Sequence, residues 1–265
     1  MRLTVPHLTA LCIAVLSACG DAHAQDRGEQ PTRVDLSVTG GYISGNLHQA
    51  QLQSRLHLSH STATSGVDLI GSAFRLWRPL TPDARLEKVG DDQSLLALPF
   101  YYLGKRPYLL GLARVERAGL RMMENRMNGG AGIGLAPVRE VNRLIRFAAG
   151  AQLERTEYAS ELMSPEWAGS GSTRTTPRLF TVGNGWFRPQ GSPIGGFFVG
   201  AFLVNPAKMR DLRGRLDAGV DFQLSKTLST RLAVNIVHES VVPAGLKTTD
   251  LRSTVGFAWK SPAKK

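Results

Sequence analysis

Alternation of apolar and polar side chains, broken by stretches rich in Gly, Pro and Asn, recurs along most of this chain. It is clearest in residues 212–224, where Leu216, Val220 and Phe222 occupy alternate positions and Arg and Asp fill most of the places between them. Successive side chains of a β-strand point to opposite faces, so such a segment has one apolar face and one charged face. Repeated about ten residues at a time, the pattern is typical of a transmembrane β-barrel, with lipid outside and a polar interior.

Twelve segments fit this description, and each is near the roughly 9–11 residues that cross a bilayer at a tilt. They are residues 34–42, 49–59, 67–78, 93–103, 108–117, 124–135, 143–155, 175–187, 193–204, 212–224, 228–239 and 249–260. An even strand number is typical of bacterial single-chain barrels. The sequence therefore predicts an all-β fold, a transmembrane antiparallel up-and-down β-barrel of about 12 strands over residues 33–260, with a C-terminal tail at 261–265.

The lengths of the connections support this topology. Those after the fourth, eighth and tenth segments are short, at residues 104–107, 188–192 and 225–227, whereas the long ones, at 79–92 and 156–174, follow the third and seventh. Outer-membrane barrels place short turns in the periplasm and long loops outside. Two connections fit less well, because the one after the ninth segment is short and the one after the sixth is not minimal.

Residues 1–24 have the features of a secretory signal peptide. Arg2 gives a positive start, residues 8–16 are apolar, and residues 22–24 read Ala-His-Ala, a typical cleavage site. Residues 25–32 would then be a disordered leader before the barrel. With the strand pattern, this predicts export to the outer membrane of a Gram-negative bacterium.

Both cysteines, Cys12 and Cys19, lie within this signal and would be lost on cleavage after Ala24. A second route stays open, because residues 16–19 read Leu-Ser-Ala-Cys and resemble a bacterial lipobox in which Cys19 would be lipidated. That route would give a lipid-anchored envelope β protein. Either route ends in the bacterial envelope.

The net charge of +11 is spread through the alternating segments. A nucleic-acid-binding protein would more often carry a concentrated basic face, so no nucleic-acid partner is expected. Two interpretations remain: the cations pair with carboxylates lining the same lumen, which is the favoured one, or they form an anion-favouring pore. The predicted lumen-lining charges are Arg55, Arg114, Glu116, Arg126, Arg146, Glu154, Arg213, Arg215, Asp217, Asp221, Arg231, Glu239, Asp250 and Arg252.

Several stretches resemble a known family, the salt-induced outer membrane proteins, also called domain of unknown function 481. They are residues 40–46, with Gly-Tyr and Ser-Gly-Asn, 108–117, 129–134, 243–250 and 255–257. The likeness covers roughly residues 33 to 260. It implies a barrel, an outer-membrane location and a link to salt or osmotic stress, and it carries over no catalytic residue.

Aromatic residues gather near the ends of the segments, where a membrane barrel carries interfacial girdles. They are Tyr42, Trp77, Phe100, Tyr101, Tyr108, Trp186, Phe187, Phe257 and Trp259. The closing segment ends in Trp259, and a terminal aromatic is what the barrel assembly machinery recognises, although here residues 260–265 extend past it. The expected partners are this machinery and outer-membrane lipid, including lipopolysaccharide, and the oligomeric state stays open.

No enzymatic chemistry is evident in the sequence. A lipid hydrolase or acyltransferase, the main alternative, needs a Ser–His pair, and His238 sits beside Glu239 on a strand that sends the two to opposite faces. The sequence offers no motif for a metal or cofactor, and we expect neither. The glycine run at 129–134 lacks the spacing of a dinucleotide fingerprint and predicts a strand approached closely by a side chain from across the lumen.

Overall fold

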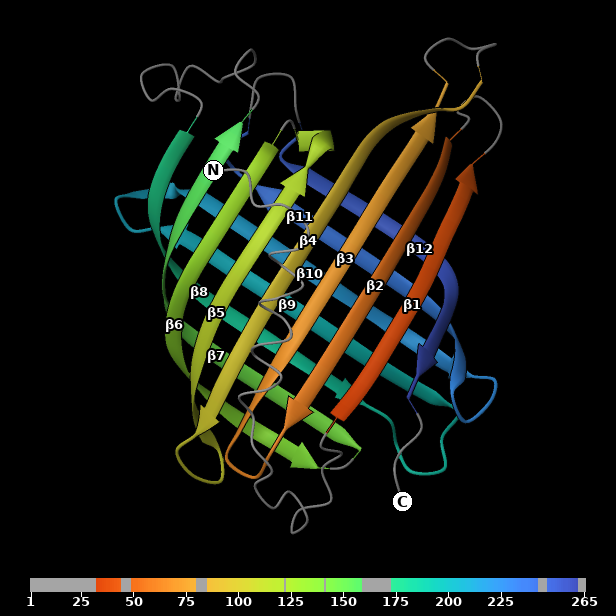
Figure 1. Cartoon of the computed structure of the whole chain (residues 1–265), viewed down its shortest axis with the longest axis vertical. Helices are drawn as coiled ribbons and strands as arrows, with labels where there is room; N and C mark the ends of the chain where they lie inside the picture. Colours follow the sequence, from red (N-terminus) through yellow and green to blue (C-terminus); the bar gives the residue numbers. More distant parts are fainter. Residues whose placement is uncertain are drawn as a thin grey trace.

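The computed structural model describes residues 32–43, 49–79, 85–121, 123–140, 142–158, 173–242 and 247–261. The expected signal peptide, Cys19, most of the leader and the end of the tail lie outside these residues. Within them, twelve antiparallel strands form one closed barrel in which each strand pairs with its sequence neighbours and β1 pairs with β12 (Figure 1). The predicted all-β, twelve-stranded up-and-down barrel is confirmed.

Each strand overlaps the segment predicted for it, and several are longer. The bounds are β1 Thr32–Ile43, β2 Gln49–Ser61, β3 Ser65–Arg78, β4 Glu87–Tyr102, β5 Pro107–Ala118, β6 Met123–Glu140, β7 Arg143–Tyr158, β8 Thr173–Phe187, β9 Ile194–Asn205, β10 Lys208–Gln223, β11 Leu228–Glu239 and β12 Thr249–Lys260, with a 3-10 turn η1 at Gly119–Arg121.

The longer β6 removes one misfit of the loop pattern. The predicted segment ended at residue 135, but β6 continues to Glu140, and Pro137 is exposed at a register shift between Leu135 and Val138, where pairing is irregular. Proline is tolerated at such a bulge because the ladder needs no donor there. The β6–β7 connection is therefore only two residues long, Val141 and Asn142.

β1 begins and β12 ends at the same end of the barrel, at the bottom of Figure 1. We call this the turn end, because the connections there, such as Thr62–Thr64 and Leu103–Arg106, are short. The opposite end is the loop end. No helix in the described ranges is long and apolar enough to cross a membrane.

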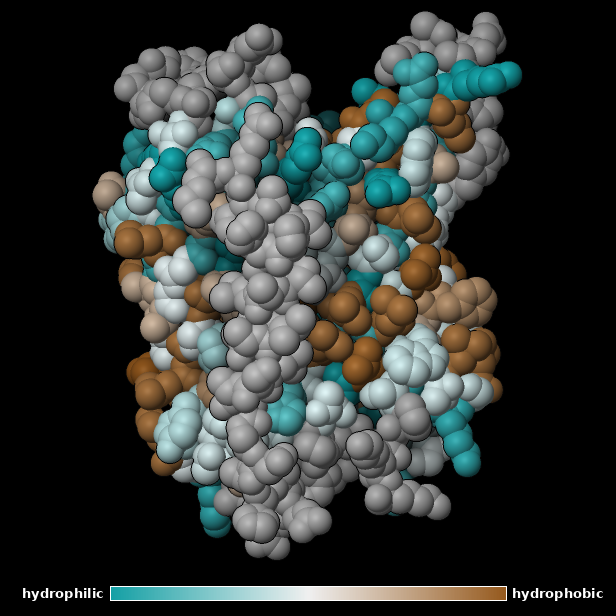
Figure 2. Space-filling model, in the orientation of Figure 1, coloured by the Kyte–Doolittle hydropathy of each residue, from teal (hydrophilic) through white to brown (hydrophobic). Residues whose placement is uncertain are grey.

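The outside of the barrel is apolar. On β12, Leu251, Val255, Phe257 and Trp259 are 67%, 56%, 58% and 43% exposed, respectively, and β1 places Val38 opposite Phe257 on the same outer face. Brown apolar side chains accordingly cover much of the surface seen in Figure 2. Soluble proteins rarely expose apolar patches of this extent.

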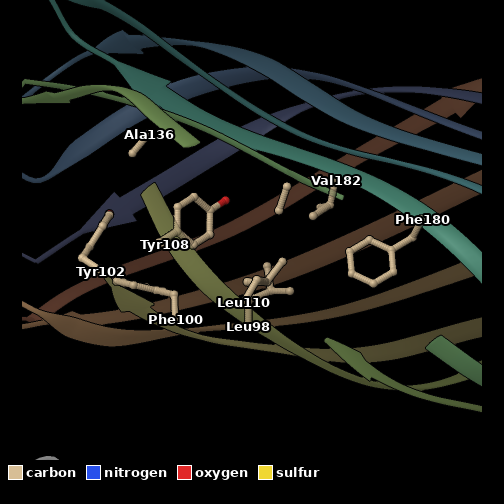
Figure 3. Packing of buried hydrophobic residues seen from close by; sticks show 9 residues of the cluster. Leu98, Phe100, Tyr102, Tyr108, Leu110, Ala136, Phe180 and Val182 are labelled. Atoms are coloured by element: carbon tan, nitrogen blue, oxygen red, sulfur yellow. The ribbon is translucent and has the colours of Figure 1, made fainter. Parts of the chain in front are cut away.

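Part of the interior is also apolar. A cluster of buried side chains comes mainly from β4, β5, β7 and β8 (Figure 3), and consists of Leu98, Phe100, Tyr102, Tyr108, Leu110, Ala136, Ala148, Phe180 and Val182. The placement of Phe100 and Tyr108 in an interfacial girdle was therefore wrong, because both rings are buried inside the barrel. The placement of Trp186 in the girdle was also wrong, because the Arg33 guanidinium lies over its ring.

The glycine run of β6 allows close approach, but by neighbouring strands. A Cβ at Gly130 or Gly132 would lie 2.4 Å from a backbone oxygen of β7, and one at Gly134 would lie 2.4 Å from the Tyr108 ring of β5. The expectation of a side chain from across the lumen was wrong. The glycines instead let adjacent strands bend tightly together.

Candidate functional site: the charged interior of the barrel

The interior near the loop end is filled by a network of ion pairs. Arg126 on β6 donates to Glu239 on β11 at 2.7 Å, and Arg178 on β8 contacts both Glu154 at 3.0 Å and Asp211 at 2.9 Å. These five side chains are at most 5% exposed. Because β6 and β11 lie on opposite sides of the closed sheet, the Arg126–Glu239 pair bridges the lumen.

Other ion pairs also join strands that are not neighbours in the sheet. They are Arg55–Asp217, between β2 and β10; Arg146–Asp68, between β7 and β3; Arg252–Asp92, between β12 and β4, at 2.7 Å; and Arg215–Glu116, between β10 and β5, at 3.5 Å. Paired guanidinium and carboxylate groups therefore cross the lumen at several levels.

The structure places every predicted lumen charge on the inner face of its strand, and most are paired there. The alternation of charges had placed Arg215 and Asp217 beside Arg231 on the adjacent strand, and that arrangement was wrong. Arg231 does not neighbour Arg215 and Asp217 in an ion pair, but contacts Asp221 at 2.7 Å and Asp35 at 3.0 Å. In the β10–β11 register Arg231 lies opposite Asp221, whereas Asp217 lies opposite Asn235 and Arg215 opposite Val237.

Five charges that are buried in the interior were missed: Asp35, Asp68, Arg121, Arg178 and Asp211. Asp92, the partner of Arg252 across the lumen, was missed as well. Arg178 could have been predicted from the alternation of its strand, because it lies between Pro177 and Leu179, which are both exposed. Arg121 could not be found in this way because it lies on the 3-10 turn η1, where the period of two does not apply. There it reaches Asp250 at 2.9 Å.

Aromatic rings connect the apolar and the ionic parts of the interior. Phe197 is stacked by both Arg55 and Arg231, whose guanidinium carbons lie 4.8 and 4.4 Å from the ring centroid. Arg146 lies 4.4 Å from the centroid of Phe100. Such cation–π contacts allow guanidinium groups to be buried beside apolar side chains.

Small cavities remain between these side chains. One at the turn end has a volume of about 240 Å³. Another, in the middle of the barrel, has about 60 Å³ and is lined by Arg114, Asn128 and Gln152. Each of these has one buried polar atom without a hydrogen-bond partner among the described residues. A polar cavity with several free partners suits an ordered water molecule.

The histidines of the described chain have small local roles. His60 contacts the Thr32 hydroxyl at 2.9 Å, His238 contacts the Thr249 hydroxyl at 2.8 Å, and His57 lies 3.4 Å from Asp68. None of these contacts is to a serine. Over the residues that the structure describes, no group of three or more His, Cys, Asp or Glu is placed to hold a metal ion.

This geometry defines a class of protein: a closed antiparallel barrel whose exterior is apolar and whose interior is charged and ion-paired. Residues 39–260 match the family described as "Protein of unknown function, DUF481", so the chain belongs to that family, as its sequence motifs indicated. The match carries no statement about salt.

The solved structures that resemble this chain have little sequence identity to it. The NanC porin is 8% identical, with a TM-score of 0.48, over 86% of this chain and 99% of that one. The translocator domain of the autotransporter NalP from Neisseria meningitidis is 13% identical, with a TM-score of 0.37, over 96% and 94% of the two chains. No curated protein matches the chain. The fold therefore rests on the strand pairing of this chain itself.

Proposed function

We propose that the protein is an integral outer-membrane β-barrel of structural or narrow-pore type. The observation that supports this is its inverted polarity. Ile133, Leu153 and Leu251 are 62–70% exposed on the outside, whereas the side chains of Glu154 and Arg178 inside are 2% and 1% exposed. A bilayer stabilises such an exterior, and a closed barrel pairs its backbone groups between strands.

Cell fractionation combined with gel mobility tests the location. We expect the full-length protein in the outer-membrane fraction, in contact with lipid and lipopolysaccharide after insertion by the barrel assembly machinery. A folded barrel should migrate differently in SDS with and without boiling. Recovery from the periplasm with one mobility under both conditions would contradict the proposal.

The ion pairs across the lumen favour a narrow or closed pore over a wide one. In planar bilayers we expect little or no conductance from the wild-type barrel. Substituting Arg126 and Glu239 together by alanine removes one bridge without leaving a lone buried charge, and should raise the conductance. The matched control removes the exposed Arg155–Glu157 pair, 3.2 Å apart, and should change nothing. Large conductance from the wild type, or an equal effect of both double variants, would refute this part.

A link to salt or osmotic stress is part of the proposal only through the family resemblance. Growth of a strain lacking the gene in high-salt medium tests that link. Unchanged growth across the salt range would remove it and leave the membrane barrel standing. The proposal includes no catalytic step.

A further inference from the structure

The cavity of about 240 Å³ at the turn end has a strongly basic wall. Side chains from the first residues of β1, the last residues of β8 and β12, and the β10–β11 turn meet there. The cationic side chains among them include Arg33, Arg188, Lys226 and Lys260. The cavity therefore lies inside the mouth of the barrel, where a small solute would enter or leave the lumen.

The carboxylates beside this cavity are already shared among several cations. Arg231 contacts Asp35 at 3.0 Å and Asp221 at 2.7 Å, and Lys260 forms ion pairs with the same two carboxylates. Arg33 reaches Asp35 only at 3.9 Å. Three cations thus share two carboxylates before the remaining basic residues are considered.

Arg188 and Lys226 add further positive charge without compensation. Arg188 Nη1 donates to Gln223 Oε1 at 3.2 Å, while Nη2 is buried with no hydrogen-bond partner in the described chain. Within the described ranges neither residue forms an ion pair. The one other carboxylate on the wall, Glu140, is 2.7 Å from Arg143. A buried guanidinium donor without an acceptor is costly, and an anion would satisfy it.

We propose that this cavity binds a small organic anion through a carboxylate or phosphate group. Arg188 would donate to the anionic oxygens, and Arg33, held with its guanidinium carbon 4.4 Å from the centroid of the Trp186 ring, would face the same group. Planar guanidinium groups match carboxylate and phosphate oxygens well. Phe100 and Leu144 supply apolar wall for the body of the ligand. The inference goes beyond the proposed function and does not require that the barrel conducts.

Calorimetric titration of the folded full-length barrel in detergent at low ionic strength tests the site. The probes are sodium benzoate, inorganic phosphate and, as a cationic counterpart, benzylammonium. We expect at least one of the two anions to bind, and Arg188→Gln to weaken that binding about tenfold, as expected for loss of a charge-assisted hydrogen bond. The anion that binds identifies the group that the site prefers.

The matched control is Arg106→Gln, which removes the same charge from an exposed side chain in a turn at the same end of the barrel that does not line the cavity. It should change the affinity less than about twofold, because an exposed charge is well screened. Binding of neither anion, equal losses in the two variants, or benzylammonium binding as tightly as the anions would overturn the proposal.

Each variant is first checked for the mobility shift on boiling, so that only folded barrels are titrated. Should Arg188→Gln fail to fold, Lys226→Gln on the exposed β10–β11 turn removes another cation of the same wall and should weaken binding about threefold, since its charge acts through solvent. Unchanged binding in that variant would also count against the site. A barrel that shifts on boiling but binds no anion refutes the site and leaves the proposed function intact.

Discussion

Replacing Glu154 by glutamine tests whether the ion network inside the barrel holds the fold together. Its carboxylate accepts a hydrogen bond from Arg178 at 3.0 Å, lies 2.6 Å from Arg213 Nη1 and 3.9 Å from Arg126, and its side chain is only 2% exposed. The substitution preserves size and one oxygen acceptor but removes the charge. The next carboxylate, that of Glu239, is 4.0 Å from Arg213.

The expected loss follows from what each arginine retains. Arg178 keeps Asp211 at 2.9 Å, and Arg126 keeps Glu239 at 2.7 Å. The loss falls mainly on Arg213, whose next carboxylate in the described chain, that of Glu239, is 4.0 Å away. Removing one member of a buried ion pair costs about 3–5 kcal/mol, because the remaining charge stays desolvated. Since only one of the three arginines is left uncompensated, we expect the low end, about 3 kcal/mol.

Urea unfolding of the barrel in detergent micelles, followed by tryptophan fluorescence, measures this free energy. The control, Glu140→Gln, breaks an exposed pair with Arg143 and should cost less than about 1 kcal/mol. Adding Arg213→Gln to the Glu154→Gln variant removes the stranded charge and should recover part of the loss. Equal free energies of unfolding for the two single variants would refute the idea that the buried network stabilises the barrel.

Two further pairs of substitutions, each a test and its control, probe the wall of the barrel by the same unfolding measurement. Gly150→Ala should lower the free energy of unfolding by about 1–3 kcal/mol, because the new Cβ would lie 2.2 Å from the Ala131 oxygen. Its control, Gly129→Ala, places a Cβ that meets nothing within 4 Å and should be neutral. Equal effects of the two would contradict the tight approach of β6 and β7. In lipid vesicles, Val255→Arg should lower the free energy of unfolding by about 2–4 kcal/mol if this face contacts hydrocarbon. Thr249→Arg, at the strand end, should lower it by only about 0–1 kcal/mol. A negligible effect at Val255 would argue against the membrane location.

The strands and their inner and outer faces could be predicted because the outer face of the barrel is apolar and most of its inner face is polar. Apolar and polar residues therefore alternate along most strands with a period of two. On β12 the outward residues Leu251, Val255 and Phe257 alternate with Arg252 and Thr254, and the structure keeps that register over the whole strand. A slip of one residue would place Arg252 outside and Val255 inside. The chemistry of the two faces therefore specifies the register strongly.

The apolar part of the interior could not be predicted in this way. In β4, both the outward Pro99 and Tyr101 and the inward Leu98, Phe100 and Tyr102 are apolar or aromatic, so alternation disappears. Periodicity reports a difference between faces, and it carries no information where the faces are alike. Phe100 and Tyr101 of this strand were consequently both assigned to the membrane interface, although the Phe100 ring is buried inside.

The identity of the ion-pair partners decides whether the lumen is open, and it depends on how the sheet closes. Arg126 and Glu239 are 113 positions apart in sequence and on opposite sides of the barrel, so no local pattern connects them. Alternation gives each charge its inward direction, while the curvature of the sheet determines which opposite charge it can reach. The same inward charges could line a water-filled pore in a wider barrel. With twelve strands the arginine side chains span the gap, and pairing across the lumen replaces hydration.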